Sequence, residues 1–249
     1  MTALTLTLIA LILILAGLVK GVTAMGLPTL GMALLSLLMP PADAAAILLA
    51  PTLLTNVLQF ATGPRLLPVL IRFWPMGLAT FGATLVSGFW LEGLDSHLAP
   101  AVLGGTLLIY GLMGLGRFHF TTPVWIEPWL SPLMGFASGL LTGTTGVTVM
   151  PAAPYLQSLS LHREDLVQAM GLAFTSGSIG LAIALSAKGA PLASPHALLV
   201  TGAALIPAFA GMEIGRRIRL AISQQAFRAC FFSGLALLGA NTMFRALPL

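Results

Sequence analysis

Residues 8–28 read LIALILILAGLVKGVTAMGLP, and this stretch decides the expected fold. An unbroken apolar run reaches Lys20 and then gives way to glycine, threonine and finally Pro28. The apolar segment as a whole covers residues 3–39. An ordinary membrane-crossing helix uses about 20 residues, so this segment is too long for one crossing. We therefore expect a helix that enters a membrane and is interrupted at Thr23–Pro28.

The composition places the whole chain in a membrane. Of its 249 residues, 57% are hydrophobic and 7% are charged, whereas soluble domains are about 25% charged. Such a chain cannot cover a globule with polar surface. A transmembrane β-barrel needs strands with alternating polar and apolar residues, but runs such as Ala44–Leu54 are almost entirely apolar. The sequence thus predicts an all-α polytopic membrane protein without a separate soluble domain.

Charge and cysteine content exclude several kinds of partner. The formal net charge is +4, but the basic residues lie mostly in the connections between apolar runs, as in cytoplasmic loops that face anionic lipid. We therefore expect membrane lipid as a partner and no nucleic acid. Cys230 is the only cysteine, which excludes an intrachain disulfide and a cysteine-based metal site. The histidines are scattered over connections, so we expect no metal and no cofactor.

The apolar runs divide the chain into two repeats. Residues 1–116 form repeat one and residues 125–249 form repeat two. Each repeat is expected to contain a broken, re-entrant helical hairpin followed by three transmembrane helices. In repeat one these are a hairpin at 3–39 and helices at 42–61, 67–91 and 98–116; in repeat two they are a hairpin at 125–159 and helices at 166–187, 197–211 and 226–247.

The distribution of positive charge favours hairpins over single broken helices for segments 3–39 and 125–159. If each segment returns to its own side, seven arginines share one face, and only Lys188 and Arg245 lie opposite. If each segment crosses once, the charge is spread almost evenly. Loops rich in lysine and arginine stay in the cytoplasm. The hairpin arrangement therefore agrees better with the charge distribution, and it places both termini outside. The seven arginines are Arg65, Arg72, Arg117, Arg163, Arg216, Arg217 and Arg219.

The two halves resemble each other in sequence. The spacing of Gly17 and Gly21 recurs at Gly135 and Gly139. An odd number of crossings in each half turns the second copy upside down, which is the inverted-repeat plan of many secondary transporters. In that plan the broken segments approach each other near the middle of the bilayer and hold the substrate.

Residues at the breaks and on the following helices form the candidate anion site. Unwound backbone at membrane depth must be buried by protein or line a wet cavity, and half-helix N-termini there favour anions. The paired glycines Gly17 and Gly21, by contrast, are expected mainly to pack helices. The predicted substrate-binding residues are Lys20, Thr23, Gly26, Pro28, Asn56, Gln59, Gly143, Thr144, Thr145, Gly146 and Thr175.

Lys20 is the charged member of this set. A charge at the inner end of an apolar run is costly and usually functional, so Lys20 would be a counter-charge for an anionic substrate. The alternative is that its side chain extends to the nearby interface. Asn56, Gln59 and Thr175 also have two interpretations, because such side chains hydrogen-bond between helices without touching a substrate.

Three stretches resemble the sulfite exporter TauE/SafE family of membrane permeases. They are Lys20–Pro28, Gly135–Gly146 and Gly211–Arg217, and the resemblance covers essentially the whole chain. It implies a permease, commonly an exporter, for sulfite, organosulfonates or other small organic acids. Repeat one reads Met25-Gly26-Leu27-Pro28 where the family commonly has a denser glycine run.

The expected function is therefore secondary transport of a small anion across a bacterial inner membrane, with a homodimer as a candidate assembly. The chain has no Walker-type nucleotide loop. A membrane-embedded enzyme would need an acid–base pair at membrane depth, whereas the acidic residues map to loops or helix ends. A non-transporting partner subunit of a membrane complex would not need a repeated broken hairpin. We expect no enzymatic activity.

Overall fold

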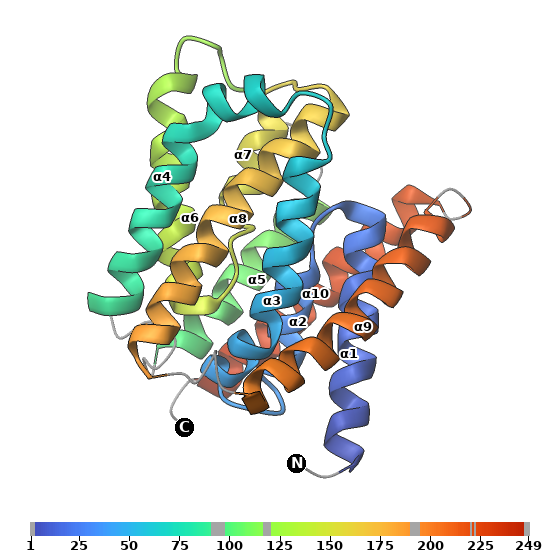
Figure 1. Cartoon of the computed structure of the whole chain (residues 1–249). Coiled ribbons are helices and arrows are strands. Elements are labelled where there is room, and N and C mark those ends of the chain that lie inside the picture. Colours follow the sequence, from blue (N-terminus) through green and yellow to red (C-terminus); the bar gives the residue numbers. More distant parts are fainter. Residues whose placement is uncertain are drawn as a thin grey trace. The chain divides into compact units, whose positions relative to one another are not determined.

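A computed structural model describes residues 3–90, 98–116, 121–189, 195–219, 221 and 223–246. Within these residues the chain forms ten helices and no strand (Figure 1), which confirms the predicted all-α fold. Arg117 of the predicted charge pattern lies outside the described residues, as do the predicted helix ends Leu91 and Leu247. The helices are α1 Ala3–Thr23, α2 Leu27–Leu35, α3 Pro41–Ala61, α4 Leu66–Trp90, α5 Ala99–Leu115, α6 Glu127–Thr145, α7 Ala152–Ser158, α8 Arg163–Ala187, α9 Pro195–Ile218 and α10 Gln224–Ala246.

Several of these helices are built for a lipid environment. Among the described residues, five helices are long and apolar enough to cross a membrane, namely α1, α3, α4, α8 and α10. Large apolar side chains cover their outer faces: Leu4 is 71% exposed and Leu237 is 72% exposed. In water this surface would be unfavourable, so it faces lipid, and the chain is an integral membrane protein.

Both long segments are broken as predicted. In the first, α1 ends at Thr23 and the short helix α2 begins at Leu27. In the second, α6 ends at Thr145 and the short helix α7 begins at Ala152.

The second broken segment returns to its own side. The N–H group of Thr122, which precedes α6, donates to the carbonyl oxygen of Ser158 at the end of α7, at 3.0 Å. The hydroxyl oxygens of the same two residues are 2.6 Å apart. Because these bonds join the start of α6 to the end of α7, the segment is a re-entrant hairpin.

The chain forms two compact units. Unit 1 comprises Met1–Pro51, His97–Phe118 and Pro191–Leu249, and unit 2 comprises Thr52–Ser96 and His119–Ala190. Unit 1 therefore holds α1, α2, α5, α9, α10 and the first half of α3. Unit 2 holds the second half of α3 with α4, α6, α7 and α8. Each unit thus combines segments from both predicted repeats.

In unit 1, helices α1 and α9 touch through glycines (Figure 1). Gly17 lies against the carbonyl oxygen of Ala208, and Gly21 lies against that of Met212, with no room for a β-carbon at either glycine. In return, Gly211 of α9 lies against the carbonyl oxygen of Ile14. Residue numbers rise together along both helices, so α1 and α9 run parallel.

In unit 2, helices α6 and α4 touch in the same way. Gly139 lies against the carbonyl oxygen of Thr80, and Gly143 lies against that of Thr84, 2.8 Å from the position a β-carbon would take. These helices also run parallel. The glycines therefore pack helices, as we predicted for Gly17 and its partner.

The ends of α1 and α6 define which residues of the two hairpins are equivalent. Counted back from the last residue of each helix, Thr23 and Thr145, Gly139 takes the place that Gly17 has in unit 1, and Gly143 takes the place of Gly21. The glycine spacing in the sequence suggested Gly135 as the counterpart of Gly17, one helical turn earlier. Gly135 also packs on α4, against Met76, which explains why spacing alone did not distinguish the two registers.

Helix α9 is longer than predicted. The sequence indicated an end near residue 211, with Glu213 in the following connection, but the helix continues to Ile218. Arg216 and Arg217 bind the Glu213 carboxylate at 2.8 Å and 2.7 Å. Ion pairs at these spacings stabilise a helix, so the charges that suggested a connection extend the helix instead.

Candidate functional site

The first break is held by the side chain of Thr23. Its hydroxyl donates to the carbonyl oxygen of Val19 at 2.9 Å and accepts the N–H group of Met25 at 3.2 Å. Beyond it, Ala24 has a φ of 65° and Gly26 a φ of 112°. These left-handed conformations turn the chain out of α1 and, at Gly26, are easily adopted only by glycine.

Lys20 lies one turn before this break. The residue is 3% exposed, and its carbonyl oxygen accepts the N–H group of Ala24 at 2.8 Å. A lysine that extended to the interface would keep its ammonium group at the surface. Its burial therefore favours the interpretation that Lys20 carries a functional charge inside unit 1.

The start of α2 faces the first break. Gly26 is the N-cap residue and supplies no side-chain hydrogen bond, and Pro28 in the first turn has no N–H group to donate. Thr29 is fully buried, and its hydroxyl has no hydrogen-bond partner among the residues that the structure describes. A helix start with uncapped N–H groups and an additional hydroxyl suits a small anion.

The second break repeats the construction of the first. The Thr145 hydroxyl donates to the carbonyl oxygen of Leu141 at 2.6 Å and accepts the N–H group of Val147 at 3.2 Å. Gly146 follows with a φ of 72°, and its N–H group donates to the carbonyl oxygen of Thr142 at 2.8 Å. The last residue of α6 thus makes the same bonds as the last residue of α1.

The other threonines of the second break are engaged in α6. Thr144 is 3.1 Å from the carbonyl oxygens of both Leu140 and Leu141, and Thr142 donates to the carbonyl oxygen of Ser138 at 2.7 Å. Hydroxyls that bond to their own helix must rotate before they can donate to an anion. Thr142 also lies with Thr148 against Gly177 of α8, so the break is packed on its neighbouring helix.

The second half of α3 meets α8 within unit 2. The Gln59 side-chain amide donates to the carbonyl oxygen of Val167 at 2.8 Å, so Gln59 links the two helices, as one of its two interpretations requires. The backbone of Asn56 lies against Gly171. Together these contacts show that the two helices run antiparallel here.

Two buried hydroxyls lie one turn beyond the contact between Asn56 and Gly171. They belong to Thr52 on α3 and Thr175 on α8, and neither has a hydrogen-bond partner within the described part of the chain. Because the helices are antiparallel, a step of one turn along each brings these two side chains to the same level. Unit 2 therefore has a polar region around Asn56 on α3, which includes the Thr52 hydroxyl, and a further buried hydroxyl at Thr175 on α8.

The predicted site residues divide between the two units. The two breaks lie in different units, and their meeting stays a prediction. Unit 1 holds Lys20, Thr23, Gly26 and Pro28; unit 2 holds Asn56, Gln59, Gly143, Thr144, Thr145, Gly146 and Thr175.

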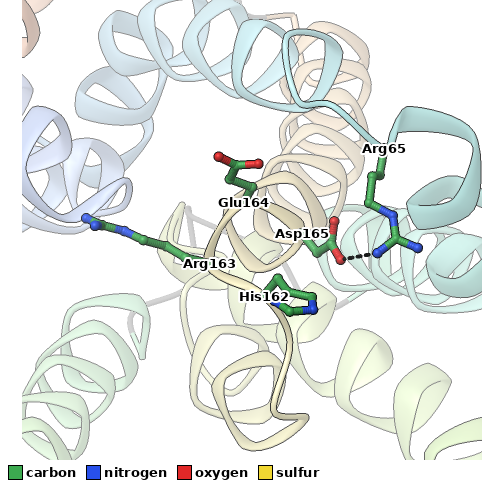
Figure 2. Close-up of a pocket in the computed structure, with 5 residues that line it drawn as sticks. All are labelled: Arg65, His162, Arg163, Glu164 and Asp165. Atoms are coloured by element: carbon green, nitrogen blue, oxygen red, sulfur yellow. Dashed lines mark hydrogen bonds and ion pairs between the residues drawn. The ribbon is translucent and has the colours of Figure 1, made fainter.

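A charged pocket of about 340 Å³ lies at the start of α8 in unit 2. Figure 2 shows Arg65 extending toward Asp165, with which it forms an ion pair at 3.0 Å, while Glu164 and Arg163 point in other directions. Arg65 and Arg163 both line this pocket, so they lie at the same end of unit 2. The predicted hairpin arrangement requires this placement.

The ion pair of Arg72 with Glu127 was not foreseen from the sequence. Arg72, which we grouped with the loop arginines, lies inside α4 and binds Glu127 through two hydrogen bonds of 2.6 Å and 2.7 Å. The two residues are far apart in sequence, so only the packing of α4 on α6 brings them together. The only available signal was an arginine within an otherwise apolar run.

Comparison with known proteins gives one match. The family model described as sulfite exporter TauE/SafE matches residues 9–242. A search of curated proteins and a search of solved structures each returned no match.

Proposed function

Because the chain belongs to the sulfite exporter TauE/SafE family, and is therefore a membrane transporter, we propose that it carries a small oxyanion by secondary transport. The substrate class is sulfite, an organosulfonate or a small carboxylate, and the direction is export from the cytoplasm of a bacterial cell. In this proposal the positive loops lie inside and both termini lie outside.

The observation that carries the proposal is the pair of breaks whose preceding helices end alike. Thr23 and Thr145 are the last residues of their helices. In each, the hydroxyl donates to the carbonyl oxygen four residues earlier and accepts the N–H group two residues later. A residue in the left-handed conformation follows each threonine. A single interrupted helix has many explanations. Two interruptions built alike, in hairpins whose helices pack alike, support one shared task for which the interruption is needed.

Packing within unit 1 also supports the inverted-repeat plan. Gly111 of α5 lies against Phe232 and Ala236 of α10, and Gly239 of α10 lies against Gly104 and Leu108 of α5 with the same atoms in contact. As residue numbers rise along α5 they fall along α10, so the two helices are antiparallel. Equivalent helices that run in opposite directions are what an inverted repeat requires.

The chemistry of unit 1 suits an anion. The N-terminal end of α2 contributes partial positive charge, the Thr29 hydroxyl is available to donate, and Lys20, nearby in sequence, contributes an amine that is positively charged when protonated. In unit 2, the backbone of Gly146 and the polar region around Asn56 are the corresponding candidates. Hydrogen bonds to a charged group are worth about 1.5–3 kcal/mol each, so a few of them are enough for micromolar to millimolar binding.

The driving force need not come from nucleotide hydrolysis. An inside-negative membrane potential favours the exit of an anion by about 2.3 kcal/mol per charge per 100 mV. Export of a monovalent anion would therefore be driven uphill by the potential alone.

Flux measurements on purified full-length protein in liposomes test the proposal. Liposomes loaded with sulfite or a small organosulfonate should release the anion without ATP, and an imposed inside-negative potential should accelerate the release. Empty liposomes and liposomes with a heat-inactivated sample are the controls. Release at the control rate for every anion of the class would overturn the proposal, and would leave a partner subunit as the better account.

A further inference from the structure

Unit 2 contains a second polar cluster, separate from the break. Arg72 on α4 and Glu127 in the first turn of α6 form a two-point ion pair, with Nε–Oε1 at 2.6 Å and Nη2–Oε2 at 2.7 Å. The Arg72 guanidinium also lies 5.2 Å from the centre of the Phe73 ring. A planar fork held in this orientation is the arrangement that recognises two oxygens of one oxyanion.

Two buried hydroxyls lie beside this pair without bonding to it. Ser131 on α6 is 3% exposed and Tyr155 on α7 is 5% exposed. The two hydroxyls lie close to each other, and neither makes a hydrogen bond of standard geometry to a described residue. Buried hydroxyls that make no hydrogen bond are unfavourable, so these two are candidates to bind a ligand.

The cluster lies along the same face of α4 as the charged pocket. Arg65 immediately precedes α4, and Arg72 follows it by two helical turns, so both start on one side of the helix. Arg65 lines the pocket of about 340 Å³ together with Asp165. Arg72 keeps 43% of its side chain exposed, so Glu127 does not seal it off.

We propose that Arg72, Ser131 and Tyr155 form an entry subsite for the transported oxyanion, and that Glu127 is the carboxylate the anion displaces from Arg72. The inference rests on the proposed transport function. Arg65 in the pocket collects the anion first, and Arg72 receives it next. The ligand is a carboxylate, sulfonate or sulfite, because each offers two oxygens to the guanidinium. The hydroxyls can donate to the third oxygen of sulfite or a sulfonate, or to the remaining lone pairs of a carboxylate.

Glu127 is placed so that it can release Arg72. It is the first residue of α6, and the N-terminus of a helix stabilises a negative charge. When the anion takes its place, the carboxylate keeps that favourable interaction. In the empty subsite Glu127 binds the partly exposed Arg72 side chain.

Glu127→Gln separates this role from a purely structural one. The change keeps the side-chain shape and removes the charge that competes with the anion. The half-saturating sulfite or organosulfonate concentration for flux should therefore fall, by roughly tenfold. If Glu127 only holds α6 against α4, the variant should lose thermal stability. Its half-saturating concentration should then stay the same or rise, and that result would overturn the proposal.

Variants of the other subsite residues keep the proposal testable if one variant does not fold. Arg72→Gln in combination with Glu127→Gln leaves no unpaired buried charge and should raise the half-saturating concentration by roughly tenfold to a hundredfold. Tyr155→Phe and Ser131→Ala should each raise it severalfold without loss of stability. Values equal to those of the unchanged protein in all three would contradict the subsite.

The matched control is the ion pair at the end of α9. Glu213 binds Arg216 and Arg217 but is exposed, so Glu213→Gln should leave the half-saturating concentration unchanged. If the unchanged protein gives no flux, the proposed function fails. If it gives flux and Glu127→Gln does not lower the half-saturating concentration, only the subsite fails.

Discussion

The two breaks share their hydrogen bonds but differ in charge. At the first, the N–H group of Ala24 bonds to Lys20, and at the second, the N–H group of Gly146 bonds to Thr142, both at 2.8 Å. Lys20 and Thr142 thus occupy the same place in the two hairpins. One is a cation and the other a threonine whose hydroxyl bonds back to Ser138.

This difference separates the residues that interrupt the helix from the side chain that is proposed to bind the anion. The backbone turn needs only a threonine at the helix end and a left-handed residue after it, and both hairpins have these. Burying an ammonium group is costly, and the second break forms without one. Lys20 is therefore not needed to shape the turn, and we infer that it is present for the anion.

The largest expected effect is at Lys20. Lys20→Ala should reduce anion flux by about a hundredfold, because a charge-assisted bond is worth about 1.5–3 kcal/mol and each factor of ten corresponds to about 1.4 kcal/mol. Lys20→Arg keeps the charge and should be impaired less. Flux assays in liposomes, with expression level as a check on folding, decide this. Normal flux in Lys20→Ala would make the residue a structural anchor and remove the main electrostatic argument.

The next effect concerns packing and should be equal in the two hairpins. Gly17→Ala and Gly139→Ala each place a methyl group against a carbonyl oxygen of the partner helix, and should destabilise the protein by about 1–3 kcal/mol. Gly82 has open space around it, so Gly82→Ala should have no such cost. Thermal unfolding in detergent compares the three. A loss at only one hairpin would break the equivalence of α1 with α6.

A smaller effect is expected at the start of α2. Thr29→Val removes a buried hydroxyl that makes no bond within the described structure, so stability should stay the same or rise. Anion affinity should fall by roughly tenfold. Binding of sulfite to the purified variant gives the affinity, and its melting temperature gives the stability. Lower stability with unchanged affinity would assign Thr29 to the fold and not to the site.

The smallest effect is expected at the paired threonines. Thr23→Val and Thr145→Val each remove a hydroxyl that both donates and accepts, which should cost about 1 kcal/mol of stability. The two losses should agree, because the bonds agree. If one variant were stable and the other not, the two breaks would differ in construction as well as in charge.

Much of the fold could be predicted because membrane-spanning helices and their interruptions depend on local composition and on the length of each apolar run. The interruptions at Gly26 and Gly146 were visible as small and polar residues inside apolar runs. The equivalence of Gly17 with Gly139 was not, because glycines recur every four residues along α6 and offer two registers. The distance of each glycine from the end of its helix, Thr23 or Thr145, distinguishes the two registers.

The candidate site was predictable in part. Lys20 stood out as a charge in an apolar segment, and its burial agrees with that interpretation. The Arg72–Glu127 pair and the free hydroxyls of Ser131 and Tyr155 depend on how α4, α6 and α7 pack. No local pattern encodes such packing between residues far apart in the chain.

Protection of single cysteines by the anion tests the central claim most directly. In a Cys230→Ala background, which removes the native thiol, Met25→Cys and Thr144→Cys, at partly exposed positions of the two breaks, would be labelled with a small thiol reagent in the presence and absence of sulfite or an organosulfonate. Ser223→Cys, at an exposed position outside both breaks, is the control. The account predicts slower labelling at both breaks when the anion is present and no change at the control. Equal labelling rates at both breaks with and without the anion, in a protein that still transports it, would contradict the assignment of the site.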